Sequence, residues 1–335
     1  MLGKQSSSQS KQQFGFYFLL LFGLFLFVML YDYFTAFLGA VIFYLLFKNF
    51  MSYLVEKKNW RASRAALLLM ILSLLIVVIP GILIVNLLYN KIAEVVSNPT
   101  SLINAFHTFD DQLKEFIGQD IFSPEQINQI KEKLAGLLPA LLNKLLGTLS
   151  TLAIMYFILY FMLVSYQEMS DFLIDFLPFE PGVTHLFQKE LYDMTVSNAI
   201  TTPLLAGIQG VSGGLAFYFL GIPDAAFWGS MCGIFSFIPI VGSAMIWLPA
   251  TLYLYVMGQH LQSYILLAYG VLIISNIDNV IRMILQKKFA DVHPVISIFG
   301  VLIGLNLFGI TGLIFGPLLI SFFVLGVKIY RRNYV

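Results

Sequence analysis

The chain of 335 residues has little charge: only 11% of its residues are Asp, Glu, Lys or Arg, whereas 59% are hydrophobic. Ordinary globular proteins carry about 25% charged residues, so a water-soluble fold is excluded. The net charge is +1 and no basic stripe is interleaved with aromatic residues, so the sequence gives no indication of nucleic-acid binding. The only cysteine, Cys232, lies in an apolar run, which excludes a disulfide framework and a thiolate metal site.

Motifs of enzymes and pumps are also lacking. The sequence has no phosphate-binding loop, no zinc-protease motif and no acidic cluster with metal-ligand spacing, so no cofactor, no metal and no ATP-driven pump are expected. Ser212, within Gly210–Gly214, matches the pattern of intramembrane serine proteases, but such a serine needs a histidine base on a neighbouring span. All four histidines lie outside the predicted spans, namely His107, His185, His260 and His293. We therefore predict a non-enzyme in which the small residues around Ser212 allow close helix packing.

Long apolar runs predict an all-α integral membrane protein, because a span needs about 20 apolar residues. The apolar run from Phe14 lacks a small-residue cleavage site after it, so it is interpreted as a retained first span. A tight turn at residues 31–33 is expected between the first two spans. The six predicted full spans are residues 14–30, 34–47, 65–88, 148–166, 198–220 and 261–275.

Residues 91–147 differ in character, because they are amphipathic and carry both acidic and basic residues. The pattern Ser123-Pro124-Glu125-Gln126 predicts a helix start with a capping box. The segment is predicted to be a small extracytoplasmic helical domain, whose apolar seam forms either an internal core or a face for a partner. It divides the chain into N-terminal spans (1–90), this insert (91–147) and a transport region (148–335).

Two apolar segments, 225–257 and 294–327, contain 33 and 34 residues, too many for one straight span, and both are interrupted by proline and glycine. Paired interrupted segments are the best sequence-level indication of a substrate site in secondary transporters. Freed carbonyls suit a cation, whereas helix N-termini suit an anionic or polar solute. Proline and glycine can also merely kink membrane helices. The candidate pathway residues around the breaks are Ser236, Pro239, Gly242, Ser243, Asn306, Gly309, Thr311, Gly312 and Pro317.

Charge predicts the topology of these two segments. If both segments crossed the membrane, Arg282, Lys287 and Lys288 would lie outside, against the positive-inside rule. If both are re-entrant hairpins, one opening outward and one inward, 14 of the 19 Lys and Arg residues lie inside and the other five belong to the 91–147 segment. We therefore predict re-entrant hairpins and cytoplasmic N- and C-termini.

A polar cluster follows the sixth predicted span. Asp278 and Arg282 are four residues apart and can pair on one helix face. The cluster is either a gate or coupling group or an interfacial ion pair at a helix end; it consists of Asn276, Asp278, Asn279 and Arg282. Asp224, in the turn before the first broken segment, is expected to be a helix N-cap.

The last third of the chain resembles the autoinducer-2 exporter-like (AI-2E) family of bacterial membrane transporters. The resemblance rests on motifs in a fixed order: Gly221-Ile-Pro223, residues 237–242, 278–282 and 293–294, and the run 307–317. The hydropathy layout matches over about residues 14–330, while Met283 stands where the family pattern has proline.

The resemblance implies a transporter of the bacterial inner membrane that lacks nucleotide-binding domains. It implies one of two activities: export of autoinducer-2, or antiport of sodium ions or protons. It also implies a homo-oligomer in the lipid bilayer, with a pentamer as one arrangement, and hairpins that belong to a moving transport unit.

Three functions are compatible with the sequence. The first is a secondary transporter that exports a small polar metabolite or signalling molecule, driven by an ion gradient and with the hairpins as gates. The second is a monovalent cation/proton antiporter, which is less favoured because the interiors of the spans contain no obvious exchanging carboxylate. The third is a non-transporting scaffold whose 91–147 segment recruits partners.

Overall fold

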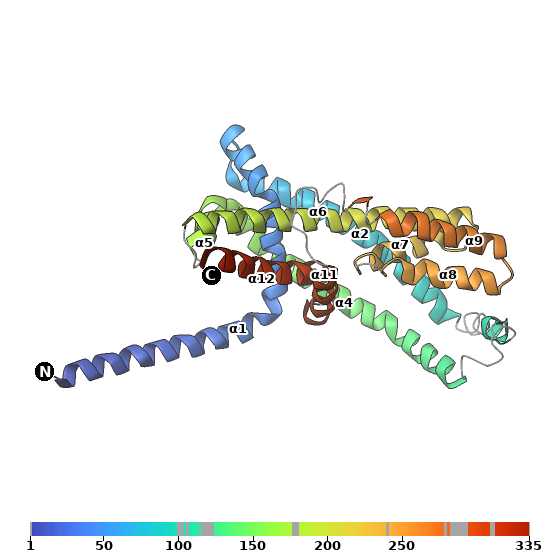
Figure 1. The fold of residues 1–335 in the computed structure, drawn as a ribbon, viewed down its shortest axis with the longest axis horizontal. Helices are drawn as coiled ribbons and strands as arrows, with labels where there is room; N and C mark the ends of the chain where they lie inside the picture. Colours follow the sequence, from blue (N-terminus) through green and yellow to red (C-terminus); the bar gives the residue numbers. More distant parts are fainter. Residues whose placement is uncertain are drawn as a thin grey trace.

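The computed structural model describes residues 2–98, 104, 107–112, 114, 124–175, 181–238, 241–277, 280–281, 294–308 and 312–334. These residues form helices and short connections, with no strand among them (Figure 1). The α-helices are α1 (Leu2–Ser52), α2 (Ala62–Ser97), α4 (Pro124–Val164), α5 (Tyr166–Asp175), α6 (Pro181–Phe219), α7 (Ala225–Phe235), α8 (Ala244–Val256), α9 (His260–Tyr269), α11 (Pro294–Phe308) and α12 (Gly312–Tyr334). Two π-helical segments, η1 (Tyr53–Lys57) and η2 (Gly270–Ile274), continue α1 and α9.

Six helical segments are long and apolar enough to cross a membrane, and each overlaps one predicted span. Many of their large apolar side chains are exposed, such as Leu72, Phe157 and Leu261. Lipid-facing helices have this character, because the bilayer core solvates apolar side chains. The prediction of an all-α, multi-pass membrane protein is therefore confirmed.

The first helix corrects one sequence-based expectation. The predicted tight turn at residues 31–33 is wrong, because α1 runs through these residues without interruption. The sequence Tyr-Asp-Tyr contains neither glycine nor proline and costs a helix little. A helix of 51 residues is about 77 Å long, so it holds two candidate spans, Phe14–Tyr31 and Tyr33–Lys57. Figure 1 shows its N-terminal arm pointing away from the other helices.

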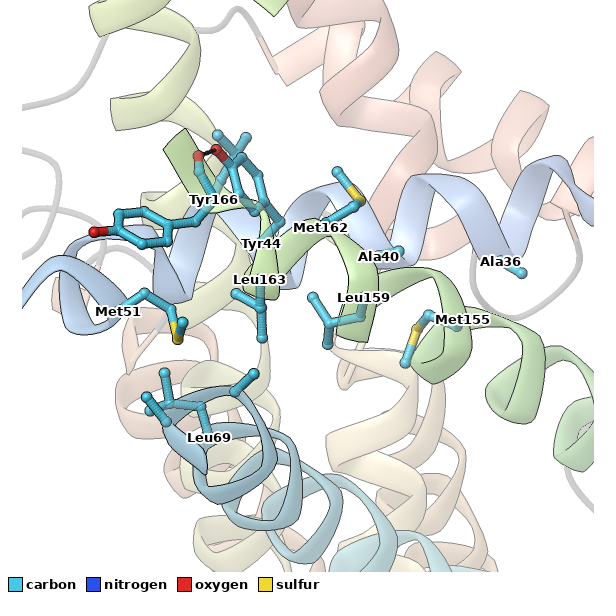
Figure 2. Packing of buried hydrophobic residues seen from close by; sticks show 13 residues of the cluster. Ala36, Ala40, Tyr44, Met51, Leu69, Met155, Leu159, Met162, Leu163 and Tyr166 are labelled. Atoms are coloured by element: carbon cyan, nitrogen blue, oxygen red, sulfur yellow. Dashed lines mark hydrogen bonds between the residues drawn. The ribbon is translucent and has the colours of Figure 1, made fainter. Parts of the chain in front are cut away.

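The second half of α1 packs against α4 and the start of α2 (Figure 2). Small residues allow this close contact: Ala36 and Ala40 of α1 are buried in one cluster with Met155 and Leu159 of α4. The Tyr44 hydroxyl donates a 2.7 Å hydrogen bond to the backbone carbonyl oxygen of Tyr166, just beyond α4. The α1–α4 interface therefore combines apolar packing with a buried hydrogen bond that fixes its register.

Helix α4 runs from Pro124 without a break to Val164. The last part of the amphipathic insert and the fourth span are thus one helix, and no helix end marks the expected boundary at residue 147. Ser123 lies outside the described residues, so the capping box stays a prediction. Ring contact between Phe109 of the insert and Tyr253 of α8, with centroids 5.8 Å apart, links the insert to the first broken segment.

Helix α6 is the scaffold for both broken segments. Its N-terminal half contacts α12 through a buried cluster that includes Phe187, Met194, Leu325 and Ile329. Its C-terminal half packs closely against α7. In Figure 1, α12 and α7 accordingly lie along different parts of α6.

Candidate functional site

The first broken segment folds back as a helical hairpin. A side chain on Gly213 of α6 would lie 2.9 Å from the Cys232 sulfur of α7, and the neighbouring Ser212 hydroxyl is 2.9 Å from the Tyr269 hydroxyl of α9. Next to Tyr269, a Cβ on Gly270 would lie 2.5 Å from the Trp247 ring of α8. Cys232 and Trp247 are therefore level with each other. If α8 continued in the direction of α7, Cys232 and Trp247 would lie about 22 Å apart along the helix axis, because a helix rises about 1.5 Å per residue. The chain therefore reverses direction between α7 and α8.

The bend of this hairpin contains three of the predicted pathway residues. Ser236 is buried and its hydroxyl donates a 2.6 Å hydrogen bond to the Gly233 carbonyl oxygen. A Cβ on Gly242 would lie 2.5 Å from the Ile238 carbonyl oxygen, so only glycine fits there without a shift of the backbone. Ser243 is buried at the start of α8. Pro239, the fourth predicted residue, lies outside the described residues.

Glycines bring α6 and α7 into backbone contact. A Cβ on Gly229 would lie 2.6 Å from the Gly214 Cα atom, and one on Gly233 would lie 2.6 Å from the Ala206 carbonyl oxygen. The glycines around Ser212 therefore allow close helix packing, as expected from the sequence. The Ser212 hydroxyl pairs with a tyrosine hydroxyl rather than with a histidine.

The second broken segment is also a hairpin, formed by α11 and α12. A Cβ on Gly300 would lie 2.6 Å from the Pro317 Cα atom, and one on Gly304 would overlap the Gly312 carbonyl group. Pairing of 300 with 317 and of 304 with 312 means that the two helices run antiparallel. The predicted residues Gly312 and Pro317 thus lie at the interface within the hairpin.

Of the other predicted residues of the second hairpin, the structure describes only Asn306. Asn306 is exposed on α11, so it faces away from the buried interface with α12. Gly309 and Thr311 lie outside the described residues. The pathway role of this break therefore stays a prediction.

Of the predicted gate cluster, the structure describes only Asn276. Its side chain is exposed, and its amide nitrogen donates to the carbonyl oxygens of Val271 and Leu272, at 3.0 and 3.1 Å. Asn276 therefore caps backbone groups of η2 instead of reaching another helix. Asp278, Asn279 and Arg282 lie outside the described residues, so their pairing stays a prediction.

The two hairpins open toward opposite ends of α6. Ala225, at the start of α7, lies near Gly214 in the last turns of α6. Gly326, near the end of α12, lies near Phe187 in the first turns of α6. This is the relative orientation that the charge distribution predicts.

Asp224 is a residue whose role the sequence did not reveal. It precedes α7, but its side chain makes no capping hydrogen bond, so the N-cap expectation is wrong. Its carboxylate instead pairs with the Lys91 ammonium group of α2, 133 residues away in the chain. A φ angle of 56° directs the backbone of Asp224 away from the geometry of an N-cap. Nothing in the local sequence signals so distant a partner.

Among the described residues, no group of three or more His, Cys, Asp or Glu side chains could hold a metal ion. The described part of α7, α8, α9 and η2 contains no Asp, Glu, Lys or Arg, and its single histidine, His260, lies at the exposed start of α9. The hairpin and its neighbour therefore offer hydroxyl, amide and backbone groups to a bound molecule.

Comparison with known proteins identifies the family. A family model described as "AI-2E family transporter" matches residues 16–332. A Mycobacterium tuberculosis protein with the name "Putative transport protein" is 24% identical over 320 residues, which cover 90% of this chain and 81% of that protein. An Aquifex aeolicus protein with the same description is 27% identical over 177 residues, and the match spans only about half of each protein, 53% of this chain and 50% of the relative. Since the family model covers nearly the whole sequence, this multi-pass membrane protein belongs to the AI-2E family of transporters.

Proposed function

We propose that this protein is a secondary transporter that exports a small polar metabolite or signalling molecule, such as autoinducer-2, with an ion gradient as the driving force. The observation that carries the proposal is the pair of broken helical hairpins that open toward opposite ends of one shared helix, α6. Broken helices that meet at mid-membrane bind substrate in many secondary transporters.

The positions of the two bends support a shared site. In the first hairpin, Gly233 lies beside Ala206 of α6. In the second, Gly312 is 14 residues before Gly326, which lies beside Phe187. Fourteen residues of helix span about 21 Å, so the second bend is level with about residue 201 of α6. Both bends therefore approach the same stretch of α6 from opposite ends.

In this proposal, the hairpins alternate as gates. Displacement of α7 and α8 from α6 would open the site on one side, and displacement of α11 and α12 would open it on the other. The pathway would run past the first bend at Ser236, Gly242 and Ser243 and past the second at Gly312 and Pro317. The cluster of Asp278, Asn279 and Arg282 would act as the gate or coupling group on the inner side.

The orientation follows from charge. Residues 48–64 and 278–293 and the C-terminal end carry most of the Lys and Arg residues outside the insert, which favours a cytoplasmic position for these segments. A cytoplasmic N-terminus as well would require α1 to bend, in the membrane, between its two candidate spans. The membrane would be the bacterial cytoplasmic membrane, with residues 91–147 on its outer side. Exposed apolar helix faces suit both lipid and a homo-oligomer, for which five copies is one arrangement.

Reconstitution in liposomes tests the function. We expect uptake or release of a labelled small polar solute, such as autoinducer-2, that depends on an imposed proton or sodium gradient. Proton flux that needs sodium but no organic solute would instead establish a cation/proton antiporter. Absence of any flux, with the protein correctly inserted, would contradict transport and favour the scaffold function.

A further inference from the structure

Two buried polar atoms in the first hairpin region have no hydrogen-bond partner among the described residues. They are the Gln209 amide oxygen of α6 and the Trp247 indole nitrogen of α8. Each side chain is only 4% exposed. One atom is an acceptor and the other carries a proton to donate, so the two have complementary requirements.

Both residues approach the same part of the bundle. Gln209 is three residues before Ser212, so the two share a face of α6, and Ser212 contacts Tyr269 of α9. Next to Tyr269, Gly270 lies against the Trp247 ring. Trp247 also belongs to the same buried cluster as Ala216, one turn beyond Ser212 on α6. Gln209 and Trp247 thus lie where α6, α8 and α9 meet.

Buried serine hydroxyls also occur on the elements that carry Gln209 and Trp247 and in the hairpin bend. Ser243 is one helical turn before Trp247, whose backbone N–H donates to the Ser243 carbonyl oxygen at 3.2 Å. Ser236, in the hairpin bend, and Ser212 are buried as well. These hydroxyls lie on α6, at the start of α8 and in the bend between α7 and α8.

The backbone near the indole is irregular. Gly270 begins the π-helical segment η2, and such segments are frequent at functional sites. The absence of a side chain at Gly270 allows the Trp247 ring to lie against the backbone of η2. The position of the indole N–H is therefore set by η2.

An unpaired buried polar group destabilises the fold, so two of them on neighbouring elements require an explanation. We propose that Gln209 and Trp247 bind the transported solute, and that this solute is a neutral molecule with neighbouring hydroxyl groups. A hydroxyl of the solute donates to the Gln209 amide oxygen, and an oxygen of the solute accepts from the Trp247 indole N–H. This site rests on the proposed transport function and narrows its substrate class.

The lack of formal charge excludes the other substrate classes from this site. An anion or cation buried here would lose its hydration without a counter-charge from the described residues of α7, α8 or the second half of α6, and that loss is costly. A hydroxyl group is both donor and acceptor, so one diol satisfies both unpaired atoms.

Tryptophan fluorescence tests binding directly. In the variant with Trp60→Phe and Trp228→Phe, Trp247 is the only tryptophan left. We expect a saturable change in its emission when glycerol, erythritol or ribose is added, and no such change with sodium chloride or sodium succinate. Adding Gln209→Leu should weaken this response at least tenfold. No saturable response to any of the three polyols, or an equal response in the Gln209→Leu protein, would overturn the proposal.

Stability and flux separate a binding role from a structural one. If Gln209 serves only the fold, or binds only water, Gln209→Leu leaves polyol flux in liposomes unchanged, and that result overturns the proposal. As a solute ligand, Gln209 is needed for flux but not for the fold, so the variant should keep or raise its melting temperature and lose at least tenfold in flux. If polyols change the fluorescence but no flux is seen with or without Gln209→Leu, transport is refuted and the proposed binding site stands. Flux that is insensitive to Gln209→Leu would refute the site and leave transport intact.

Discussion

Gly304 of α11 and Gly312 of α12 face each other so closely that a side chain on either would overlap the carbonyl group of the other. We expect Gly304→Ala to separate the two helices of the second hairpin and to reduce transport at least tenfold, because backbone atoms at such an interface cannot give way cheaply. The measurement is solute flux in liposomes, with the amount of inserted protein held equal. The matched control is Gly207→Ala in α6, where an added Cβ meets no described atom within 4 Å. Equal flux from both variants would show that close contact in the hairpin is dispensable.

The ion pair between Lys91 and Asp224 links α2 to the start of the first hairpin. Both side chains are partly exposed, at 25% and 44%, so the pair should contribute less than about 1 kcal/mol. We expect Lys91→Gln and Asp224→Asn each to lower the melting temperature only slightly. The melting temperature of the double variant should be no lower than that of either single variant. A double-mutant cycle at low and high salt measures the coupling. A coupling that salt does not weaken would contradict an exposed ion pair.

The buried hydrogen bond from Tyr44 to the Tyr166 carbonyl oxygen should stabilise the α1–α4 interface. Tyr44→Phe removes this hydrogen bond, and a typical intramolecular hydrogen bond contributes about 0.5–1.5 kcal/mol to stability. We expect a lower melting temperature in detergent. The control is Tyr17→Phe, because Tyr17 is 65% exposed in the N-terminal arm of α1. A loss of stability no larger than that of the control would mean that the bond contributes little.

Apolar run length predicted the helices well. Six candidate spans and the two broken segments appear among the described residues, because hydrophobic length and proline or glycine act locally. The prediction of a turn at residues 31–33 was wrong, also for a local reason. Tyr-Asp-Tyr is polar enough to suggest a loop but contains no residue that breaks a helix.

The site was less predictable, because it depends on which helix faces meet. Gln209 and Trp247 each look ordinary in an apolar run, and only the fold shows that a polar atom of each is buried without a partner among the described residues. Asn306 is the opposite case: it lies next to a break in the sequence, yet its position on α11 turns it outward. The pairing of Lys91 with Asp224 could not be predicted from the sequence either, because it joins segments far apart in the chain.

The central claim is that the two broken segments are hairpins that open on opposite sides of the membrane. Cysteines introduced at Met257 and Lys287, one at a time in a Cys232→Ala background, test it most directly. In intact cells, the account predicts that a membrane-impermeant maleimide labels the protein with Met257→Cys. It predicts that the protein with Lys287→Cys is labelled only after the membrane is permeabilised. Labelling of both positions from the same side would contradict the account.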